Sequence, residues 1–485
     1  MYVLEILLTV SLLLLVIVQH IRAVDRRVLS TLFTAALVAF LASLILGQLR
    51  WQMAPIYLLL LVLTLLRLKR SRSHAVLRYV GAALGVLLLA GGVALSLALP
   101  ILTLPTPQGP YAVGSRQLSL IDESRDEAYF GLPDQSRELP LRVWYPGLLI
   151  ESQARPRVRT LWQDLYRGPM DWVAFLAGYM RGIKTHTYPD IPLAPSDRPY
   201  PVLVFSHAYG FFAEQNTLLM EHLASHGYVV IGVNHTRMSI RVISSQGQII
   251  AIDPSRRQQA LAEADALSDE ALTEIFAGAA SPEELSAKLS TLAPALTEQL
   301  AIRVADLRYV MDSVAAPSSA NPALSELLGQ VDPQRIGLIG MSLGGGTALQ
   351  TCKLDTRCRA GLNLDGPLLG DHQWQTLQAP FLSMHSTWTL PFYESVLRNS
   401  RGPYYEVLVE GAEHGDFSDM TFLLPKWLGA RGEIAPQRAI EVVNAVALRF
   451  FDAHLREGAP PRFDADEFPE LHVRTNAPAG GPVEP

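Results

Sequence analysis

The segment that decides the fold is Arg335-Ile-Gly-Leu-Ile-Gly340-Met-Ser342-Leu-Gly-Gly-Gly346-Thr-Ala-Leu-Gln-Thr-Cys352. An apolar, β-favouring run precedes its Gly-x-Ser-x-Gly motif, and a helix-compatible run follows it. In this strand-turn-helix context, the flanking glycines permit a tight turn that exposes a serine hydroxyl at the edge of a sheet. A purely structural Gly-rich turn is the alternative, but the context favours Ser342 as a nucleophile.

Apolar runs on both sides of this segment predict an α/β domain. The predicted strands are residues 141–145, 202–205, 229–233, 336–339, 361–364, 381–384 and 405–409. Several are continuously apolar, which is typical of parallel strands buried on both faces. Helical patterns lie between them at 216–225, from the capping box at 281–284, and at 296–314. We expect a mostly parallel sheet flanked by helices, with the chemistry beyond the carboxyl ends of its strands.

A serine nucleophile needs a base, which in this architecture is normally a histidine later in the chain. His372, His385 and His414 follow Ser342 up to the exit of the last predicted strand. His414 comes after that strand, in a Gly-bearing loop that could carry the imidazole over the serine. His385 ends a strand and His372 lies in a polar loop, so both fit structural or solvated roles better. The chain order Ser, acid, His therefore favours His414 as the base.

The acid that orients the histidine should leave a strand end between Ser342 and His414. Asp365 ends the strand that follows the nucleophile helix. The segment that follows the next strand has no carboxylate before Glu394. Asp365 is therefore the preferred acid, and Glu394 is the less favoured candidate. A simple turn aspartate is the alternative for Asp365.

An oxyanion hole needs two backbone N–H groups aimed at the developing negative charge. Leu343, directly after the nucleophile, should supply one of them. The loop Ser206-His-Ala-Tyr-Gly210, after the strand at 202–205, should supply the other, and we assign it to Tyr209. A plain strand-exit turn is the alternative there, and His207 fits a scaffold hydrogen-bonding role better than that of a second base.

The N-terminal part of the chain differs in composition from the rest. The whole chain of 485 residues is 49% hydrophobic with a formal net charge of −6, yet residues 1–104 hold nine Lys and Arg against two acids. The remainder carries a net charge of −13, which argues against nucleic-acid binding. Four apolar runs, at 6–21, 28–49, 51–66 and 79–104, predict a transmembrane region of about four spans. The first and third are marginal in length, and the third contains Pro55.

The distribution of basic residues predicts the orientation of these spans. Lys and Arg cluster after the first run and after the third, whereas the loop after the second contains only Arg50. By the positive-inside rule, both chain termini then lie outside the cytoplasm, and the protein is a multi-pass protein of the plasma or inner membrane. A cleaved signal peptide is the competing interpretation of the first run, but it lacks a basic start and a cleavage site. We thus expect three regions: spans at 1–104, a catalytic domain at 105–475 and a disordered tail at 476–485.

Two further features leave alternatives open. Cys352 and Cys358 are the only cysteines; in an extracytoplasmic domain they are as consistent with a short disulfide as with two buried thiols. Neither their number nor their spacing supports a zinc site, and no metal or organic cofactor is expected. The aromatic residues within 161–180 and the pair Phe211-Phe212 could form a lid or a lipid-facing surface, although packing is the commoner role.

Residues 110–460 resemble the plasma-type platelet-activating factor acetylhydrolase family, calcium-independent lipid esterases with an α/β-hydrolase fold. The matching segments are Val204-Phe-Ser-His-Ala-Tyr-Gly210, Gly340-Met-Ser-Leu-Gly-Gly-Gly346, Leu364-Asp-Gly366 and Glu413-His-Gly-Asp-Phe-Ser-Asp419. The resemblance implies the triad Ser342, Asp365 and His414, with Tyr209 and Leu343 as oxyanion donors. The chain departs from the family pattern in its His-Ala-Tyr-Gly loop, where the family usually has His-Gly before an apolar residue, and in its membrane-spanning region. The resemblance extends to bacterial dienelactone-hydrolase and polyester-cleaving relatives.

These observations predict a membrane-anchored serine carboxylester hydrolase that forms an acyl-enzyme. The expected partners are an ester or phospholipid substrate with a short or oxidised acyl group, and the lipid bilayer. Alternatives with the same triad are an acyltransferase that uses an alcohol acceptor and a broad-specificity lipase or polyester hydrolase. A non-catalytic membrane sensor is disfavoured, because an inert domain has little reason to keep three triad residues at strand ends.

Overall fold

The structure is a computed structural model in which the chain forms two compact units. The first comprises Met1–Thr103 and Leu165–Lys184, and the second comprises Leu104–Asp164 and Thr185–Pro485. The residues that the structure describes are 2–21, 24–68, 75–150, 158–166, 172–267, 274–275, 282–316, 322–367, 375–386, 396, 399–423, 426 and 431–477.

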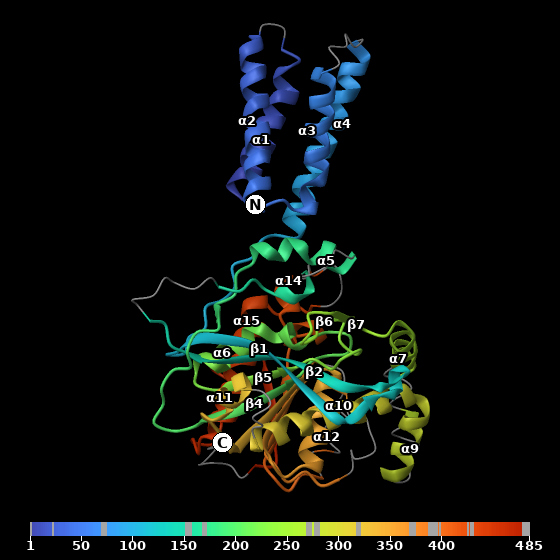
Figure 1. Ribbon diagram of the computed structural model, residues 1–485, viewed down its shortest axis with the longest axis vertical. Helices are drawn as coiled ribbons and strands as arrows, with labels where there is room; N and C mark the ends of the chain where they lie inside the picture. Colours follow the sequence, from blue (N-terminus) through green and yellow to red (C-terminus); the bar gives the residue numbers. More distant parts are fainter. Residues whose placement is uncertain are drawn as a thin grey trace. The chain divides into compact units, whose positions relative to one another are not determined.

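The first unit contains four apolar helices, drawn in blue in Figure 1, which confirms the expectation of about four helices in this region. They are α1 (Val3–Val18), α2 (Arg26–Ile45), α3 (Ala54–Leu68, after the 3-10 turn η1, Trp51–Met53) and α4 (Ala75–Ala98). Among the described residues, Arg26–Ile45, Trp51–Leu68 and Tyr79–Ala98 are long and apolar enough to cross a membrane, with mean hydropathies of 2.3, 1.7 and 2.2. α1 is shorter, at 16 residues.

Polar contacts place the ends of these helices. The Arg50 guanidinium, between α2 and η1, forms two hydrogen bonds of 2.7 and 2.9 Å with the Glu5 carboxylate near the start of α1. The same guanidinium donates to the Leu99 carbonyl just past α4. At the other end of the helices, Arg67 donates to the Leu29 carbonyl, 2.9 Å away. The helices therefore run up and down, with the chain start, residue 50 and the exit of α4 at one end.

The segment Leu165–Lys184 belongs to this unit although it is remote in sequence. It contains α5 (Trp172–Ala177) and the 3-10 helix η4 (Gly178–Gly182). The Trp51 indole donates to the Leu176 carbonyl at 3.2 Å, and its ring contacts Phe175. The aromatic residues expected to form either a lid or packing are divided. Tyr166 and Tyr179 are buried, whereas Trp172 and Phe175 are 71% and 51% exposed. Trp162, in the second unit, is itself buried, and Met170 lies outside the described residues.

The second unit contains a ten-stranded sheet with the order β12-β11-β10-β9-β8-β4-β5-β2-β1-β3. The strands are β1 (Ala112–Glu127), β2 (Leu132–Gly147), β3 (Thr187–Pro189), β4 (Tyr200–Ser206), β5 (Val229–Val233), β8 (Val331–Met341), β9 (Cys358–Leu364), β10 (Phe381–His385), β11 (Tyr404–Val409) and β12 (Leu471–Thr475), with a separate hairpin of β6 (Arg241–Ile243) and β7 (Ile249–Ala251). The six central strands from β5 to β11 are parallel, and β2 and β12 pair antiparallel at their two sides. This mixed, mostly parallel sheet confirms the expected α/β-hydrolase class.

Helices cover both faces of the sheet because its central strands are apolar on both sides (Figure 1). The helical elements are η2 (Ala128–Phe130), η3 (Gln163–Leu165), η5 (Ala213–Asn216), α6 (Thr217–Ser225), α7 (Pro254–Ala266), α9 (Pro282–Leu292), α10 (Pro294–Ala315), α11 (Pro322–Leu328), α12 (Leu343–Leu354), η6 (His414–Phe417), α14 (Met420–Leu423) and α15 (Pro436–Leu455). Val202 and Val204 of β4 pack in one cluster with α10 and α12, whereas Leu203 and Phe205 pack in another with α6 and α15. Because successive side chains of a strand point to opposite faces of the sheet, α10 and α12 cover one face, and α6 and α15 cover the other.

Candidate active site

Ser342 occupies the turn between β8 and α12, with φ 55° and ψ −127°. A non-glycine residue at positive φ is strained, and such strain is typical of a serine displayed at the top of a sheet. Two glycines make the turn possible. A Cβ on Gly340 would lie 1.8 Å from the Gly344 carbonyl oxygen, and one on Gly344 would lie 2.0 Å from the Ser206 carbonyl oxygen. Both glycines of the predicted Gly-x-Ser-x-Gly motif are therefore required, because a side chain at either position would clash with the backbone.

Asp365 lies beside Ser342 because their strands are neighbours. Met341 of β8 pairs with Leu364 of β9, and the Ser342 N–H donates to the Leu364 carbonyl at 2.8 Å. Asp365 also has a positive φ, 51°. The Asn363 side chain closes this turn: its carbonyl accepts from the Gly366 N–H at 2.8 Å and its amide donates to the Gly366 carbonyl at 3.0 Å.

The Asp365 carboxylate is buried, 2% exposed, and is held on both oxygens. Oδ1 accepts from the Ser386 N–H at 2.8 Å, and the Ser386 hydroxyl donates to the same carboxylate. Oδ2 lies 2.6 Å from Nδ1 of His414. The structure thus brings together the predicted acid and the predicted base.

His414 begins η6, just after β11 and its turn. The Asp416 carboxylate holds this loop, because it accepts from the Glu413 and Gly432 N–H groups at 2.9 and 2.7 Å and from the Thr421 hydroxyl at 2.7 Å. The His414 side chain is 45% exposed. With Nδ1 bound to Asp365, its Nε2 is the nitrogen left for a reacting group.

The structure records no hydrogen bond between Ser342 and His414 within its described residues. The serine–histidine contact of an unliganded hydrolase is commonly long and tightens only when substrate binds. The predicted nucleophile is therefore placed by its turn and its neighbouring strand, whereas the acid and base are placed by direct contact.

Two free backbone N–H groups lie next to the nucleophile. Neither Leu343 nor Tyr209 donates its backbone N–H to another described residue, whereas the adjacent Ser342 and Ala208 N–H groups donate to Leu364 and Gln215. The Tyr209 and Leu343 side chains pack in one small apolar cluster with α7 and α10. Because Gly344 packs on the carbonyl of Ser206, the two donor-bearing backbones are neighbours. This is the arrangement that an oxyanion hole requires.

The other residues weighed as base or acid have different surroundings. His385 is 1% exposed, and its ring contacts the Ser386 carbonyl and the Glu406 carboxylate. His372 and Glu394 lie outside the described residues. Within the described part of the chain, no group of three His, Cys, Asp or Glu side chains could hold a metal ion.

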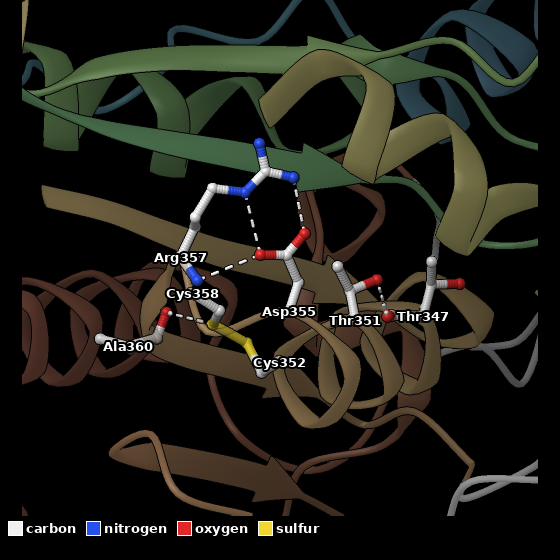
Figure 2. The surroundings of a disulfide bond; sticks show 7 residues. All are labelled: Thr347, Thr351, Cys352, Asp355, Arg357, Cys358 and Ala360. Carbon is white, nitrogen blue, oxygen red and sulfur yellow. Dashed lines mark hydrogen bonds and ion pairs between the residues drawn. A yellow bond between two sulfur atoms is a disulfide. The ribbon is translucent and has the colours of Figure 1, made fainter. Parts of the chain in front are cut away.

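The two cysteines form a disulfide, which Figure 2 shows at the end of the nucleophile helix. The bond joins Cys352 in the last turns of α12 to Cys358 at the start of β9, with their Cα atoms 5.0 Å apart. Between them, Asp355 accepts hydrogen bonds from the Arg357 backbone and guanidinium. The cross-link thus closes the far end of the segment that begins with Ser342 and ends with Asp365.

Sequence reasoning missed the residues that orient the acid and the base. Ser386 follows β10, the neighbour of β9, and the carboxyl ends of adjacent parallel strands meet at one edge of a sheet. Its position was therefore a usable signal. Asn363, two residues before Asp365, is a common turn-closing residue and was also recognisable. Asp416 carried no such signal, because its partners Gly432 and Thr421 are placed by the tertiary fold.

The chain is similar to a known protein family over most of its length. The family model described as platelet-activating factor acetylhydrolase, isoform II, matches residues 99–459. The platelet-activating factor acetylhydrolase of Cavia porcellus is 25% identical over 378 residues, covering 75% of this chain and 80% of that protein. The Gallus gallus enzyme of the same name is 24% identical over 376 residues, covering 73% and 83%.

A solved structure shares the fold. The ferulic acid esterase from Streptomyces cinnamoneus superimposes with a TM-score of 0.58 at 24% identity, covering 78% of this chain and all of that one. At this identity the likeness concerns the fold alone, whereas the family match extends over about three-quarters of the sequence and includes every candidate site residue. The chain therefore belongs to the platelet-activating factor acetylhydrolase, isoform II, family of carboxylic ester hydrolases.

Proposed function

We propose that this protein is a membrane-anchored serine esterase with the triad Ser342, His414 and Asp365. The observation that carries the proposal is the 2.6 Å contact between Asp365 and His414, formed at the edge of the sheet where the strained turn presents Ser342. The serine follows β8, the buried carboxylate follows β9 and the half-exposed imidazole comes after β11. These three groups fit the roles of nucleophile, acid and base.

In the proposed reaction, the Ser342 hydroxyl attacks the ester carbonyl while His414 Nε2 takes its proton. Asp365 accepts the hydrogen bond from Nδ1–H, fixes this tautomer and stabilises the imidazolium that forms. The imidazolium then protonates the departing alcohol, leaving an acyl-serine. Water attacks the acyl-serine with His414 again as the base, which releases the acid and restores the serine.

The negative charge of each tetrahedral intermediate would be met by the Tyr209 and Leu343 N–H groups. Each is free of other described acceptors, so it needs no rearrangement when charge develops on the carbonyl oxygen. Such a fixed donor contributes roughly 10²-fold to 10³-fold in kcat.

The proposed substrates are esters with a short or oxidised acyl group, including the sn-2 ester of a phospholipid. The name shared by the family model and the relatives, platelet-activating factor acetylhydrolase, supports an acetyl ester on a glycerophospholipid. Tethering to the bilayer would raise the local concentration of such lipids.

The substrate class is tested by profiling the detergent-solubilised full-length protein with glycerophosphocholines of graded sn-2 acyl length. We expect kcat/KM to be highest for acetyl and short or oxidised chains and to fall by at least tenfold at long saturated chains. Equal rates at all lengths would instead favour the broad-specificity lipase. An acyl group that partitions to an added alcohol in preference to water, seen by product analysis, would favour the acyltransferase.

Membrane anchoring is supported by the composition and arrangement of α1 to α4. Leucine, isoleucine and valine side chains on their outer faces are exposed, for example Val38, Ile45, Leu68 and Leu87 at 59% or more. Hydrocarbon-facing surfaces of this kind are expected in a bilayer. The basic residues Arg26, Arg27 and Arg67 lie at the end opposite Glu5 and Arg50, which supports a cytoplasmic location for that end.

The catalytic unit would then lie outside the cytoplasm, where disulfides persist. A C-terminal alkaline phosphatase fusion is expected to be active, and Cys352 and Cys358 are expected to resist alkylation unless a reductant is added. A cytoplasmic reporter at Pro485 serves as the control and should be inactive. An inactive phosphatase fusion, together with alkylation of both thiols without reductant, would contradict the proposed orientation and place the catalytic unit in the cytoplasm.

A further inference from the structure

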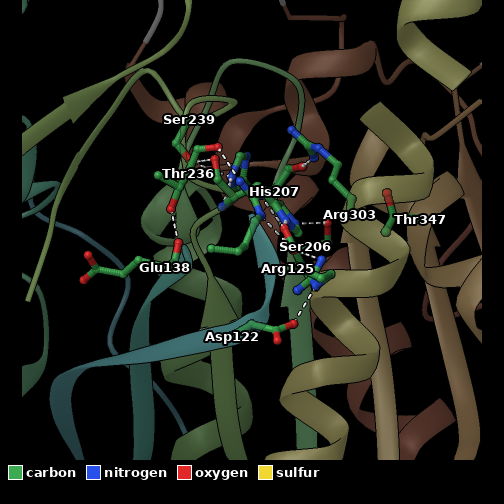
Figure 3. A network of polar contacts seen from close by, with 12 residues as sticks. Asp122, Arg125, Glu138, Ser206, His207, Thr236, Ser239, Arg303 and Thr347 are labelled. Atoms are coloured by element: carbon green, nitrogen blue, oxygen red, sulfur yellow. Dashed lines mark hydrogen bonds and ion pairs between the residues drawn. The ribbon is translucent and has the colours of Figure 1, made fainter. Parts of the chain in front are cut away.

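A buried polar network lies directly under the loop that follows β4 (Figure 3). It contains a second Ser–His–Asp chain: Ser206 Oγ lies 2.9 Å from His235 Nε2, and His235 Nδ1 lies 2.8 Å from Asp306 Oδ2. All three residues are 0% exposed, so neither substrate nor water reaches the serine. This chain of contacts therefore cannot act as a second catalytic triad, and its place under the oxyanion loop indicates another role.

Asp306 is the charged anchor of this network. Arg137 forms two hydrogen bonds with its carboxylate, at 3.0 and 2.7 Å, and Arg125 adds a third at 2.8 Å. Burial is the largest single influence on the pKa of Asp306 and would raise it, but the Arg137 charge and the hydrogen bonds from His235 and Arg137 together lower that pKa well below its ordinary value. The ionised carboxylate accepts the Nδ1–H of His235, whose pKa is lowered to about 4, chiefly by burial. His235 is therefore neutral at pH 7 and accepts the Ser206 hydroxyl on Nε2.

His207 is the second arm of the network, and its tautomer follows from its partners. The backbone N–H of His235 donates to His207 Nε2 at 3.3 Å, so Nε2 carries no proton. The Ser239 hydroxyl lies 2.8 Å from the same nitrogen. The ring proton is consequently on Nδ1, which donates to the Ala208 carbonyl oxygen at 2.6 Å. Burial and the nearby Arg303 charge lower the pKa of His207 well below its ordinary value, which keeps the ring neutral.

This contact fixes the direction of one peptide group. The Ala208 C=O and the Tyr209 N–H belong to the same planar trans peptide, in which the two bonds point in opposite directions. When the His207 ring holds the carbonyl, the Tyr209 N–H must point away from the ring. That N–H is the donor assigned to the oxyanion hole, and it is free of other described acceptors.

The preceding peptide group is fixed in the same way. Arg303 of α10, 0% exposed, donates from Nη1 to the His207 carbonyl oxygen at 2.6 Å. On the other side of this peptide, the Ala208 N–H donates to Gln215 Oε1 at 2.8 Å. Two consecutive peptide groups of the loop are thus held by side chains, and the first unheld donor is Tyr209.

We propose that His207 and Arg303 are positioning residues that set the oxyanion donor, the Tyr209 N–H, by binding the carbonyls of Ala208 and His207. The proposal rests on the proposed esterase function. The Ser206–His235–Asp306 chain supports it from below, because His235 contributes the backbone N–H that fixes the tautomer of His207.

Histidine offers a matched pair of variants for the test. In His207→Asn, the side-chain amide can occupy the place of Nδ1 and donate to the Ala208 carbonyl. In His207→Gln, the amide reaches the place of Nε2, so the Ala208 carbonyl keeps only its longer hydrogen bond, 3.2 Å, from the Phe211 N–H. We expect kcat for a short-chain p-nitrophenyl ester to fall roughly 10²-fold to 10³-fold in His207→Gln, the effect of losing one oxyanion donor, and less than tenfold in His207→Asn. KM should change less than threefold in both variants.

A tetrahedral-intermediate mimic supplies a readout that a merely structural role would not move. The affinity of a trifluoromethyl ketone should fall in parallel with kcat in His207→Gln and be largely restored in His207→Asn. His226→Gln is the matched control, because the His226 ring also binds a backbone carbonyl, that of His222, at the C-terminal end of α6 away from the triad. It should lower the melting temperature and leave kcat unchanged.

Arg303 provides an independent second pair if the His207 variants do not fold. Arg303→Lys retains a cationic donor and should keep kcat within tenfold of the wild type, whereas Arg303→Met should lose at least tenfold in kcat at unchanged KM. If Gln and Asn at 207 lose activity equally, or if His207→Gln and Arg303→Met keep full kcat per folded protein, the proposal is wrong. If the wild type itself does not hydrolyse the ester, the proposed esterase function fails instead, so the two failures are distinguishable.

Discussion

Replacing Ser342 by alanine is expected to reduce kcat for a short-chain p-nitrophenyl ester by roughly 10⁶-fold, the loss measured when the nucleophile of a serine hydrolase triad is removed. Labelling by a fluorophosphonate probe should disappear together with activity. The physical reason is that Ser342 lies on the strained turn beside Asp365, which holds His414, so the Ser342 hydroxyl is the group that His414 is placed to deprotonate. The substitution removes one oxygen from a turn whose geometry depends on glycines, so the fold should be retained.

The second Ser–His–Asp chain makes this prediction unusually discriminating. Ser206 has a histidine partner at 2.9 Å, yet it is fully buried. If burial decides which serine reacts, Ser342→Ala should show no residual labelling at Ser206. Ser313→Ala removes a hydroxyl that donates to the Tyr309 carbonyl within α10, and as the control it should keep wild-type activity and labelling. Labelling that survives in the Ser342 variant would contradict the assignment of the nucleophile.

The parallel core of the sheet could be predicted from the sequence because its strands are short, continuously apolar and separated by helical patterns. Every predicted strand lies within a strand of the structure, from β2 to β11. The strand-turn-helix at Ser342 was equally recognisable, because the steric needs of Gly340 and Gly344 leave a local signature. Asp365 and His414 then followed from chain order, and the 2.6 Å contact between them is the part of the candidate site that the structure supplies directly.

Features that depend on partners remote in sequence could not be predicted. The outer strands of the sheet are one case. β12 is exposed beyond its first residue, and β1, which lies next to the edge strand β3, is rich in polar residues and mixed in burial, so neither has a strong apolar pattern. The segment Leu165–Lys184 is another, because its contact with Trp51 joins residues 125 positions apart. The buried network under the oxyanion loop is a third: Arg137, His235 and Asp306 come from three separate elements, and none has a motif of its own.

Replacing Asp365 by asparagine should produce the other large effect, a fall in kcat of roughly 10⁴-fold, as when the aspartate of a serine protease triad becomes an amide. The asparagine amide would present an N–H to His414 Nδ1, which favours the tautomer with the proton on Nε2. That tautomer cannot accept the proton of Ser342. Because the Ser386 N–H can still donate to the side-chain carbonyl of asparagine, the geometry of the turn should survive, and KM should change little.

A second aspartate of the same segment provides the matched control. Asp355 follows the C-terminal end of α12, the end opposite Ser342, and accepts hydrogen bonds from Arg357 beside the disulfide (Figure 2). These bonds lower the pKa of Asp355, so Asp355→Asn should cost stability above the ordinary aspartate pKa and leave kcat unchanged. Its stabilising contribution in the wild type should fade as the pH falls through that lowered pKa, when the carboxylate is protonated. If Asp365→Asn kept kcat within tenfold of the wild type, a group other than the Asp365 carboxylate would have to orient His414. The variant Ser386→Ala, which disturbs the turn but keeps the carboxylate, would then distinguish an effect of the turn on kcat from an effect of the carboxylate itself.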